Sequence, residues 1–196
     1  MIVVIYTIAA LVVGSIPFAF YLGRIALKED IREWGEDKNP GAVNAWKAGG
    51  WKIGLSGGVL DVLKGFVPVF LAQYASHVSG WALVPIAIAP VVGHAFTPLL
   101  RFHGGKAVAA SFGMWAALTQ GFGFLAFAGT TGVFWAVQRA DAWAMFFGHL
   151  GLLVFLLVFL PVPYLLILWI LETTIVTWKH RRDLKEPIRL RSFSLR

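Results

Sequence analysis

The residues best suited to chemistry lie in short polar segments between long apolar stretches. Segment 35–50 holds several glycines together with the side-chain donors Asn39, Asn44 and Lys47. Glycine readily adopts positive φ, which lets successive backbone N–H groups converge on an anion. Because long loops in compact bundles often bind ligands, we interpret this segment as an anion-binding loop. A solvated basic loop is the alternative interpretation.

A second glycine-rich segment, 103–109, precedes a predicted helix. Gly104, Gly105 and Lys106 stand at its N-terminus, where backbone N–H groups and a cation favour a phosphate. The segment is not a Walker A loop, because the upstream glycine is missing and Lys106 is followed by Ala107 rather than Ser or Thr. The alternative is a loop whose one lysine sets membrane topology.

A third group consists of ionisable residues inside apolar stretches. Asp61 and Lys64 are three residues apart and share one helix face, so we expect a structural ion pair. Ionisable residues at membrane depth are often functional, so we regard His94 and Glu172 as candidate functional residues. The alternatives are that His94 caps a neighbouring helix and that Glu172 pairs with charge near Lys179.

Several kinds of chemistry are excluded. The chain has no cysteine, so disulfides, thiolate catalysis and cysteine metal sites are ruled out. No Ser–His–Asp arrangement and no pair of histidines with an acid at metal-ligand spacing is visible, so we expect neither a metal nor another cofactor. We interpret His77 and His149 as structural or interfacial. The formal charge of +7 does not indicate nucleic acid, because the charges lie in short loops between apolar segments.

The elements that must position these residues are membrane helices. Of 196 residues 58% are hydrophobic, and the mean hydropathy is +0.73, too apolar for a soluble domain of this size. A helix needs about 20 apolar residues to span a bilayer. We therefore predict an all-α polytopic membrane protein of about seven transmembrane helices, at 2–26, 56–75, 81–100, 106–118, 121–137, 142–160 and 162–178. The short fourth and fifth segments leave open a re-entrant pair or one bent span.

The positive charges predict the orientation. Lys and Arg are concentrated after the first, third and fifth segments and in the tail, whereas 76–80, 118–121 and 160–163 contain none. Basic loops stay cytoplasmic, which places the N-terminus outside and the C-terminus in the cytoplasm. We predict one integral-membrane domain over 1–183 and a basic cytoplasmic tail over 184–196.

Six motifs in a fixed order resemble the bacterial integral-membrane glycerol-3-phosphate acyltransferases that use acyl-phosphate as donor. The resemblance covers about residues 10–183. The motifs are Gly14-Ser15-Ile16-Pro17-Phe18, Asn39-Pro40-Gly41-Ala42-x-Asn44, Asp61-x-x-Lys64-Gly65, Gly93-His94, Gly104-Gly105-Lys106-x-Val108-Ala109 and Lys179-His180-Arg181.

This resemblance implies a seven-helix enzyme of the inner membrane with its active site at the cytoplasmic face. The implied reaction moves a fatty acyl group from acyl-phosphate to the 1-hydroxyl of glycerol 3-phosphate, giving lysophosphatidic acid, without acyl carrier protein. The implied site residues are Lys106, His94 and Asn44 as catalytic, and Asn39, Gly41, Lys47, Gly104, Gly105 and His180 as substrate-binding.

The sequence departs from the family pattern at the first loop, which usually reads Gly-Ser-Gly-Asn-x-Gly-Ala-Thr-Asn with an Arg three residues on. Here 36–38 (Glu-Asp-Lys) replaces Ser-Gly and is one residue longer, Val43 replaces Thr, and Lys47 replaces Arg. Asp183 stands where the family has Asn. Lysine lacks the bidentate fork of arginine, and acids repel a phosphate. The alternative is therefore a transferase for another polyol or phosphate acceptor.

A reading of a different class is a non-catalytic transporter or lipid-binding relative. Asp61, His94 and Glu172 would then form a proton path. The absence of an internal repeat argues against a transporter of two similar halves.

Overall fold

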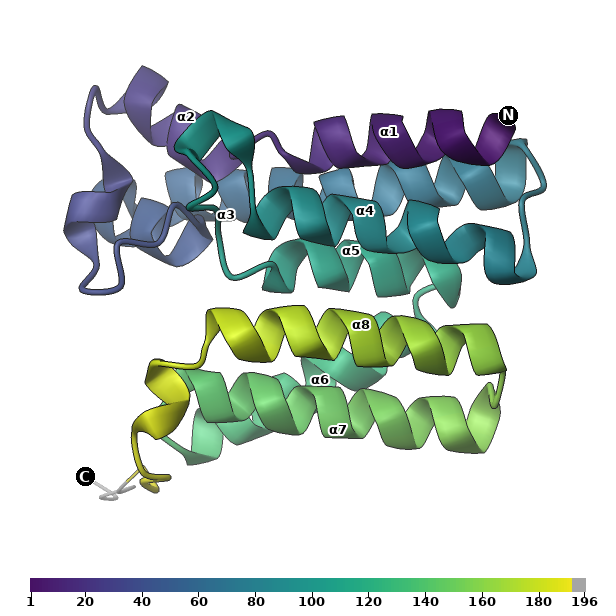
Figure 1. Cartoon of the computed structure of the whole chain (residues 1–196). Helices are drawn as coiled ribbons and strands as arrows, with labels where there is room; N and C mark the ends of the chain where they lie inside the picture. The colour runs from purple at the N-terminus through teal and green to yellow at the C-terminus, as the bar shows by residue number, and fades with distance from the viewer. Residues whose placement is uncertain (192–196) are drawn as a thin grey trace.

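The computed structural model describes residues 1–191, and they form an all-α bundle whose helices run side by side (Figure 1). The buried apolar core includes Trp115, Phe127 and Leu168. The helices are α1 (Ile2–Gly14), α2 (Phe18–Ala26), α3 (Ala42–Phe70), α4 (Leu83–Ala95), α5 (Val108–Leu118), α6 (Phe122–Val137), α7 (Asp141–Phe159) and α8 (Pro163–Lys179).

Four stretches among the described residues are long and apolar enough to cross a membrane: Ile2–Ala26, Ala42–Ala75, Gly80–Leu100 and Asp141–Phe159. Helices α5 and α6 are apolar but shorter. The all-helical membrane character is thus confirmed, and the number of seven spans stays a prediction.

The first predicted segment, 2–26, is broken into two helices between Gly14 and Phe18. Lys64 on α3 is buried and donates to the carbonyl of Ile16 at 2.7 Å, while its ammonium lies 2.8 Å from Asp61. A backbone group freed by a helix break needs a partner where water is absent. The predicted Asp61–Lys64 ion pair is confirmed, and it also supplies that partner.

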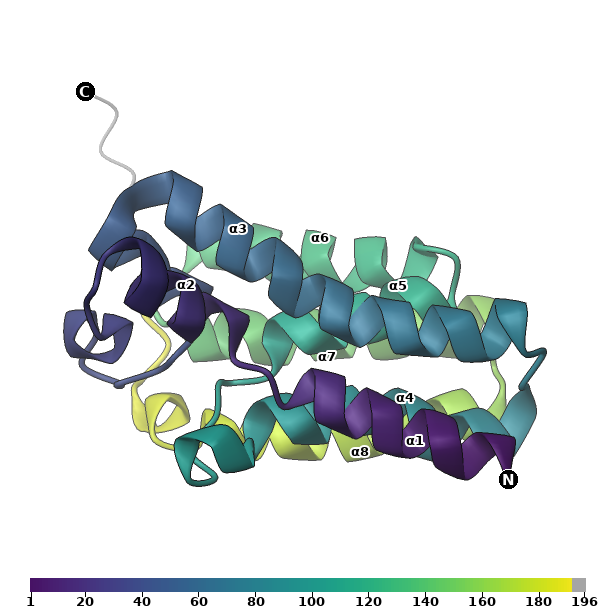
Figure 2. The same ribbon diagram turned by 90° about the horizontal axis from the view of Figure 1, so that it is seen from above.

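Helix α3 begins earlier than predicted. Segment 35–50 was expected to be a loop, but it is helical from Ala42 on, so Asn44 and Lys47 are helical residues. Gly50 interrupts the helix with a φ of 72°, which turns its first two turns away from the rest. Asp61 consequently lies within α3 and not at the start of a segment. Figure 2 shows α3 running the length of the bundle.

Close packing of α3 against α5 depends on glycine. A Cβ atom on Gly65 would lie 2.0 Å from the carbonyl oxygen of Ala110, and one on Gly113 would lie 1.9 Å from that of Val62. Small residues let helix backbones approach this closely in membranes. The contact fixes the beginning of α5, with the residues just before it, beside α3.

The loops that carry Lys and Arg gather at one end of the bundle, which we call the basic end (Figure 1). The N-terminus and the connections α3–α4, α5–α6 and α7–α8 lie at the other end. The one-sided distribution of charge is confirmed, whereas its cytoplasmic location stays a prediction.

The predicted tail folds back on the bundle as far as it is described. The backbone N–H of Arg139 donates to the carbonyl of Arg189, and that of Arg191 donates to Val137. Trp143 on α7 donates its indole N–H to the carbonyl of Glu186 at 2.8 Å. The remainder of the predicted tail, 192–196, lies outside the described residues.

Candidate functional site

Lys106 is the meeting point of three segments that are distant in the sequence. Its ammonium nitrogen lies 2.7 Å from a carboxylate oxygen of Asp37 and 2.7 Å from one of Asp183. Asp37 belongs to the loop before α3, Asp183 follows α8, and Lys106 lies two residues before α5 begins. We call this group the Asp37–Lys106–Asp183 cluster.

Lys106 and Asp37 favour each other's charged forms. Burial disfavours the charged form of Lys106, but its hydrogen bonds to Asp183 and Asp37 outweigh this and raise the pKa of the ammonium. Burial likewise opposes the charge of Asp37, yet the hydrogen bonds from Lys106 and Asn44 lower the pKa of that carboxyl. An ammonium has three N–H donors. Two of those of Lys106 are engaged, which leaves one for a ligand.

The loop before α3 is held by Asn44, which is buried. Its side-chain amide donates to Asp37 at 3.1 Å and to the carbonyl of Asn39 at 2.9 Å. A Cβ on Gly35 would lie 2.2 Å from the Asn44 side chain, and one on Gly41 would lie 3.2 Å from that of Asn39. Asn44 therefore orients Asp37 toward Lys106. The side-chain oxygen of Asn39 is buried and has no hydrogen-bond partner among residues 1–191.

The Gly104–Gly105 turn packs against His94. The N–H of Gly105 donates to the carbonyl of His94 at 3.0 Å, and a Cβ on Gly105 would lie 2.1 Å from the imidazole Nε2. Lys179 donates to the carbonyls of Ala95 and Gly104, each at 2.9 Å. The two glycines are needed because the backbone approaches His94 this closely. The sequence did not identify Lys179 as a candidate site residue, although it belongs to the motif Lys179-His180-Arg181.

His180 lies beside the cluster but points inward. It follows α8 directly, is 4% exposed, and its Nδ1 lies 2.9 Å from the carbonyl of Val176. Burial lowers the pKa of His180, which favours the neutral ring. Its carbonyl accepts the N–H of Leu184, which helps to place Asp183.

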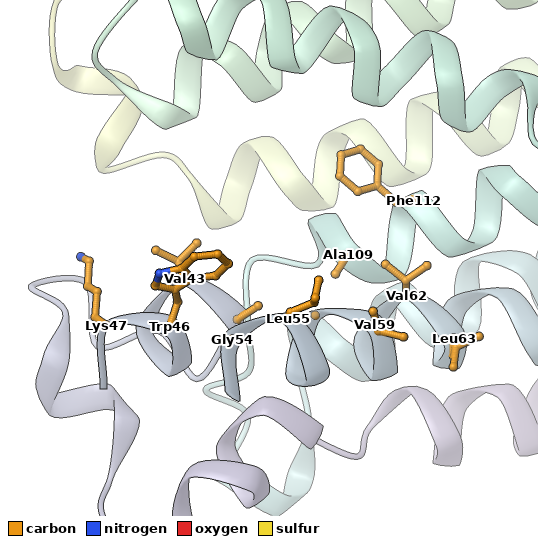
Figure 3. A pocket seen from close by; sticks show the side chains of 12 residues that line it. Val43, Trp46, Lys47, Gly54, Leu55, Val59, Val62, Leu63, Ala109 and Phe112 are labelled. Atoms are coloured by element: carbon orange, nitrogen blue, oxygen red, sulfur yellow. The ribbon is translucent and has the colours of Figure 1, made fainter. Parts of the chain in front are cut away.

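A groove of about 670 Å³ runs along α3 and α5 (Figure 3). Its walls are almost wholly apolar and include Val43, Leu55 and Val59 of α3 with Phe112 of α5. Lys47 is the one charged residue among those that line it, and it lies at one end of the groove. The structure therefore brings Lys47 to the groove rather than into the Asp37–Lys106–Asp183 cluster.

A second contact between ionisable side chains lies deep in the bundle. His149 on α7 and Glu172 on α8 are joined at 2.8 Å and are 3% and 0% exposed. The expected pairing of Glu172 with charge near Lys179 is wrong, because Lys179 binds backbone carbonyls instead. Nothing in the spacing of two separate helices indicated that His149 would be the partner. Among residues 1–191, no group of three or more side chains suited to a metal ion occurs.

Comparison with known proteins gives one consistent result. A family model described as glycerol-3-phosphate acyltransferase matches residues 4–189. Glycerol-3-phosphate acyltransferase 1 of Thermotoga maritima is 34% identical over 190 residues, which cover 90% of this chain and 93% of that protein. The glycerol-3-phosphate acyltransferase of Rubrobacter xylanophilus is 34% identical over 193 residues, or 96% of this chain and 93% of that protein.

The fold is also similar to a solved structure. The crystal structure of PlsY (YgiH), an integral membrane glycerol 3-phosphate acyltransferase, in its glycerol 3-phosphate form superposes with a TM-score of 0.82. The two chains are 29% identical, and the match covers 94% of this chain and 90% of the other. The helices of that membrane protein and of this chain are therefore arranged alike.

Proposed function

Since the chain belongs to the glycerol-3-phosphate acyltransferase family, we propose that it moves a fatty acyl group from acyl-phosphate to the 1-hydroxyl of glycerol 3-phosphate, giving lysophosphatidic acid. The observation that carries this proposal is the position of Lys106. Lys106 follows the Gly104–Gly105 turn just before α5 begins. It lies three residues before Ala109, which lines the apolar groove.

The groove suits the acyl chain of the donor. Its apolar walls include side chains that are exposed on the outside of the bundle, and each buried methylene of a bound chain contributes about 0.8 kcal/mol. A chain lying along α3 would bring its head to the beginning of α5, where backbone N–H groups and Lys106 favour a phosphate. The same geometry supports a donor that arrives by lateral diffusion in the lipid, without an acyl carrier protein.

The proposed transfer is a single displacement. The acceptor hydroxyl oxygen attacks the acyl carbon, the bond from that carbon to the phosphate oxygen breaks, and the hydroxyl proton passes to the departing phosphate. Lys106 and the N–H groups at the beginning of α5 stabilise the charge that develops on the carbonyl and on the phosphate. Holding two anionic substrates side by side supplies a further part of the rate.

The other predicted site residues take supporting roles in this proposal. Asn44 orients the first loop, and His94 supports the Gly104–Gly105 turn through its contact with Gly105. Lys47 and the basic residues after α8 contribute positive potential for the acceptor, while the buried His180 helps to place Asp183 through its backbone carbonyl. In this proposal His94 positions the Gly104–Gly105 turn and does not carry a proton.

We also propose the orientation that the charges predict. The basic end faces the cytoplasm, the N-terminus lies outside, and seven spans cross the inner membrane. This places the Asp37–Lys106–Asp183 cluster at the cytoplasmic face, where a soluble phosphorylated acceptor reaches it.

The experiment is an acyl-transfer assay with the purified protein in lipid nanodiscs. Palmitoyl-phosphate, palmitoyl coenzyme A and palmitoyl acyl carrier protein are each supplied with glycerol 3-phosphate, and lysophosphatidic acid is measured. Product is expected from palmitoyl-phosphate alone. Product only from the coenzyme A or carrier-protein arm would exclude the proposed donor, and no product in any arm would exclude the proposed activity.

A further inference from the structure

The residue that is expected to receive a phosphate is already held by two acids. Lys106 is in hydrogen-bonding contact with both Asp37 and Asp183, each at 2.7 Å. In the proposed arrangement this ammonium holds the donor's phosphate and the acceptor lies beside the donor, so a phosphate on the acceptor also comes close to the two carboxylates. The cluster by itself carries a formal charge of −1, although it lies where an anionic substrate is proposed to bind.

Neighbouring cations do not cancel this charge at the ammonium itself. Lys179 donates its hydrogen bonds to the carbonyls of Ala95 and Gly104. Lys47 lines the groove along α3. Within the described residues, the two acids are thus the charged groups in direct contact with Lys106.

The effect of these acids depends on the charge of the ligand. Coulomb's law with salt screening gives each carboxylate an unfavourable effect of roughly five- to tenfold on the affinity for a phosphate dianion at about 5 Å. A neutral polyol escapes this repulsion. Its hydroxyl groups can also donate hydrogen bonds to the same carboxylates.

We propose that Asp37 and Asp183 are specificity-determining residues that narrow the preference of this site for a phosphorylated over an unphosphorylated polyol acceptor. The inference rests on the proposed acyl transfer and names the acceptor class of the same site. Glycerol becomes a competing acceptor beside glycerol 3-phosphate, since both present the hydroxyl that is acylated.

Asp183 offers the cleaner test of the two acids. Asp37 also accepts hydrogen bonds from Asn44 and from the backbone of Asn39, so its replacement disturbs the first loop. The side chain of Asp183 contacts Lys106. Asp183→Asn removes one charge with almost no change of shape.

Matched controls lie beside each acid. Glu186→Gln removes the same charge three residues after Asp183, and Glu36→Gln does so one residue before Asp37. Both glutamates are exposed. A general change in surface potential would act equally in test and control variants, whereas contact with Lys106 distinguishes them.

The experiment compares the two acceptors with palmitoyl-phosphate as donor. The ratio of kcat/KM for glycerol 3-phosphate to that for glycerol is expected to rise five- to tenfold in Asp183→Asn, mainly through a lower KM for the phosphorylated acceptor. Glu186→Gln should leave the ratio within twofold of the wild type. Asp37→Asn, read against Glu36→Gln, repeats the test if Asp183→Asn fails to fold.

A second measurement does not need turnover. Calorimetric titration of inorganic phosphate into the purified proteins should show five- to tenfold tighter binding to Asp183→Asn than to the wild type. If no acceptor is acylated but phosphate binding tightens in this way, the proposed function fails while the anion-excluding role of the acids is supported. An unchanged or weaker phosphate affinity, or an unchanged acceptor ratio in an active variant, would overturn the inference.

Discussion

Two groups of ionisable side chains in this protein have nearly equal contact distances, but one group is partly exposed and the other is buried. The Asp37–Lys106–Asp183 cluster is joined at 2.7 Å with side chains that are 24–39% exposed, whereas His149 and Glu172 meet at 2.8 Å and are almost completely buried. Water can replace a lost partner in the first group but not in the second. The comparison indicates that the exposed cluster can exchange its partners for a ligand, while the buried pair holds two helices in register.

The two groups also differ in the secondary structure from which they are assembled. The cluster is assembled from a loop, a turn and the residues after α8, and the pair is assembled from the middle of two helices. The indole N–H of Trp169 donates a further hydrogen bond to the carbonyl of His149 at 2.8 Å. Stability is therefore expected to depend on the pair, and turnover on the cluster.

The largest expected effect is on the buried pair. Glu172→Ala leaves a buried histidine without its partner, which should cost about 3–5 kcal/mol of stability. Thermal unfolding in detergent measures this as a large fall in Tm. Replacing both His149 and Glu172 by leucine should restore much of the loss, because no unpaired polar group then remains. A Tm near the wild type for Glu172→Ala would contradict the structural role of the pair.

A smaller effect is expected at the glycine turn. Gly105→Ala places a methyl group against the imidazole of His94, and overpacking of this kind costs about 1–3 kcal/mol. Turnover should fall by roughly tenfold or more as the Lys106 turn shifts, with a modest decrease in Tm. Gly132→Ala on α6 is the matched control, since nothing lies within 4 Å of its added Cβ. Equal turnover in the two variants would show that the close approach to His94 is unimportant.

The smallest expected effect is a pH dependence of the first loop. Hydrogen bonding lowers the pKa of Asp37 below its ordinary value of 3.8, so its contribution is fully present above that pH and is lost as the pH falls through the lowered value. Because this carboxylate is one-third exposed, the contribution is no more than about 1 kcal/mol. Hydrogen exchange of the 35–41 amides should accelerate in acid for the wild type but not further for Asp37→Asn. If exchange in the wild type did not depend on acid, the proposed contribution of the Asp37 carboxylate to the first loop would be wrong.

The parts that the sequence predicts well are those fixed by local pattern. Hydropathy located the apolar helices, and the spacing of Asp61 and Lys64 predicted their pairing, because residues three apart share a helix face. The distribution of Lys and Arg predicted which loops gather at one end. Each of these features depends on neighbours along the chain.

The parts that were missed depend on contacts between distant segments. Nothing local relates Asp37 to Asp183, yet both reach Lys106, and nothing relates His149 to Glu172. The helical start at Ala42 was missed because the preceding Asn39-Pro40-Gly41 favours a turn and glycines continue to Gly50. The departures from the family pattern at positions 37 and 183 marked the right residues without indicating that they share one partner.

Lys106 is proposed to stabilise the transfer of the acyl group, and the turnover of Lys106→Ala with palmitoyl-phosphate and glycerol 3-phosphate tests this role. Loss of one electrostatic donor of this kind lowers the rate by about 10²–10³. A loss of that size is expected at a Tm close to the wild type, because the cluster is partly exposed. Turnover near the wild type, in folded protein, would contradict this role.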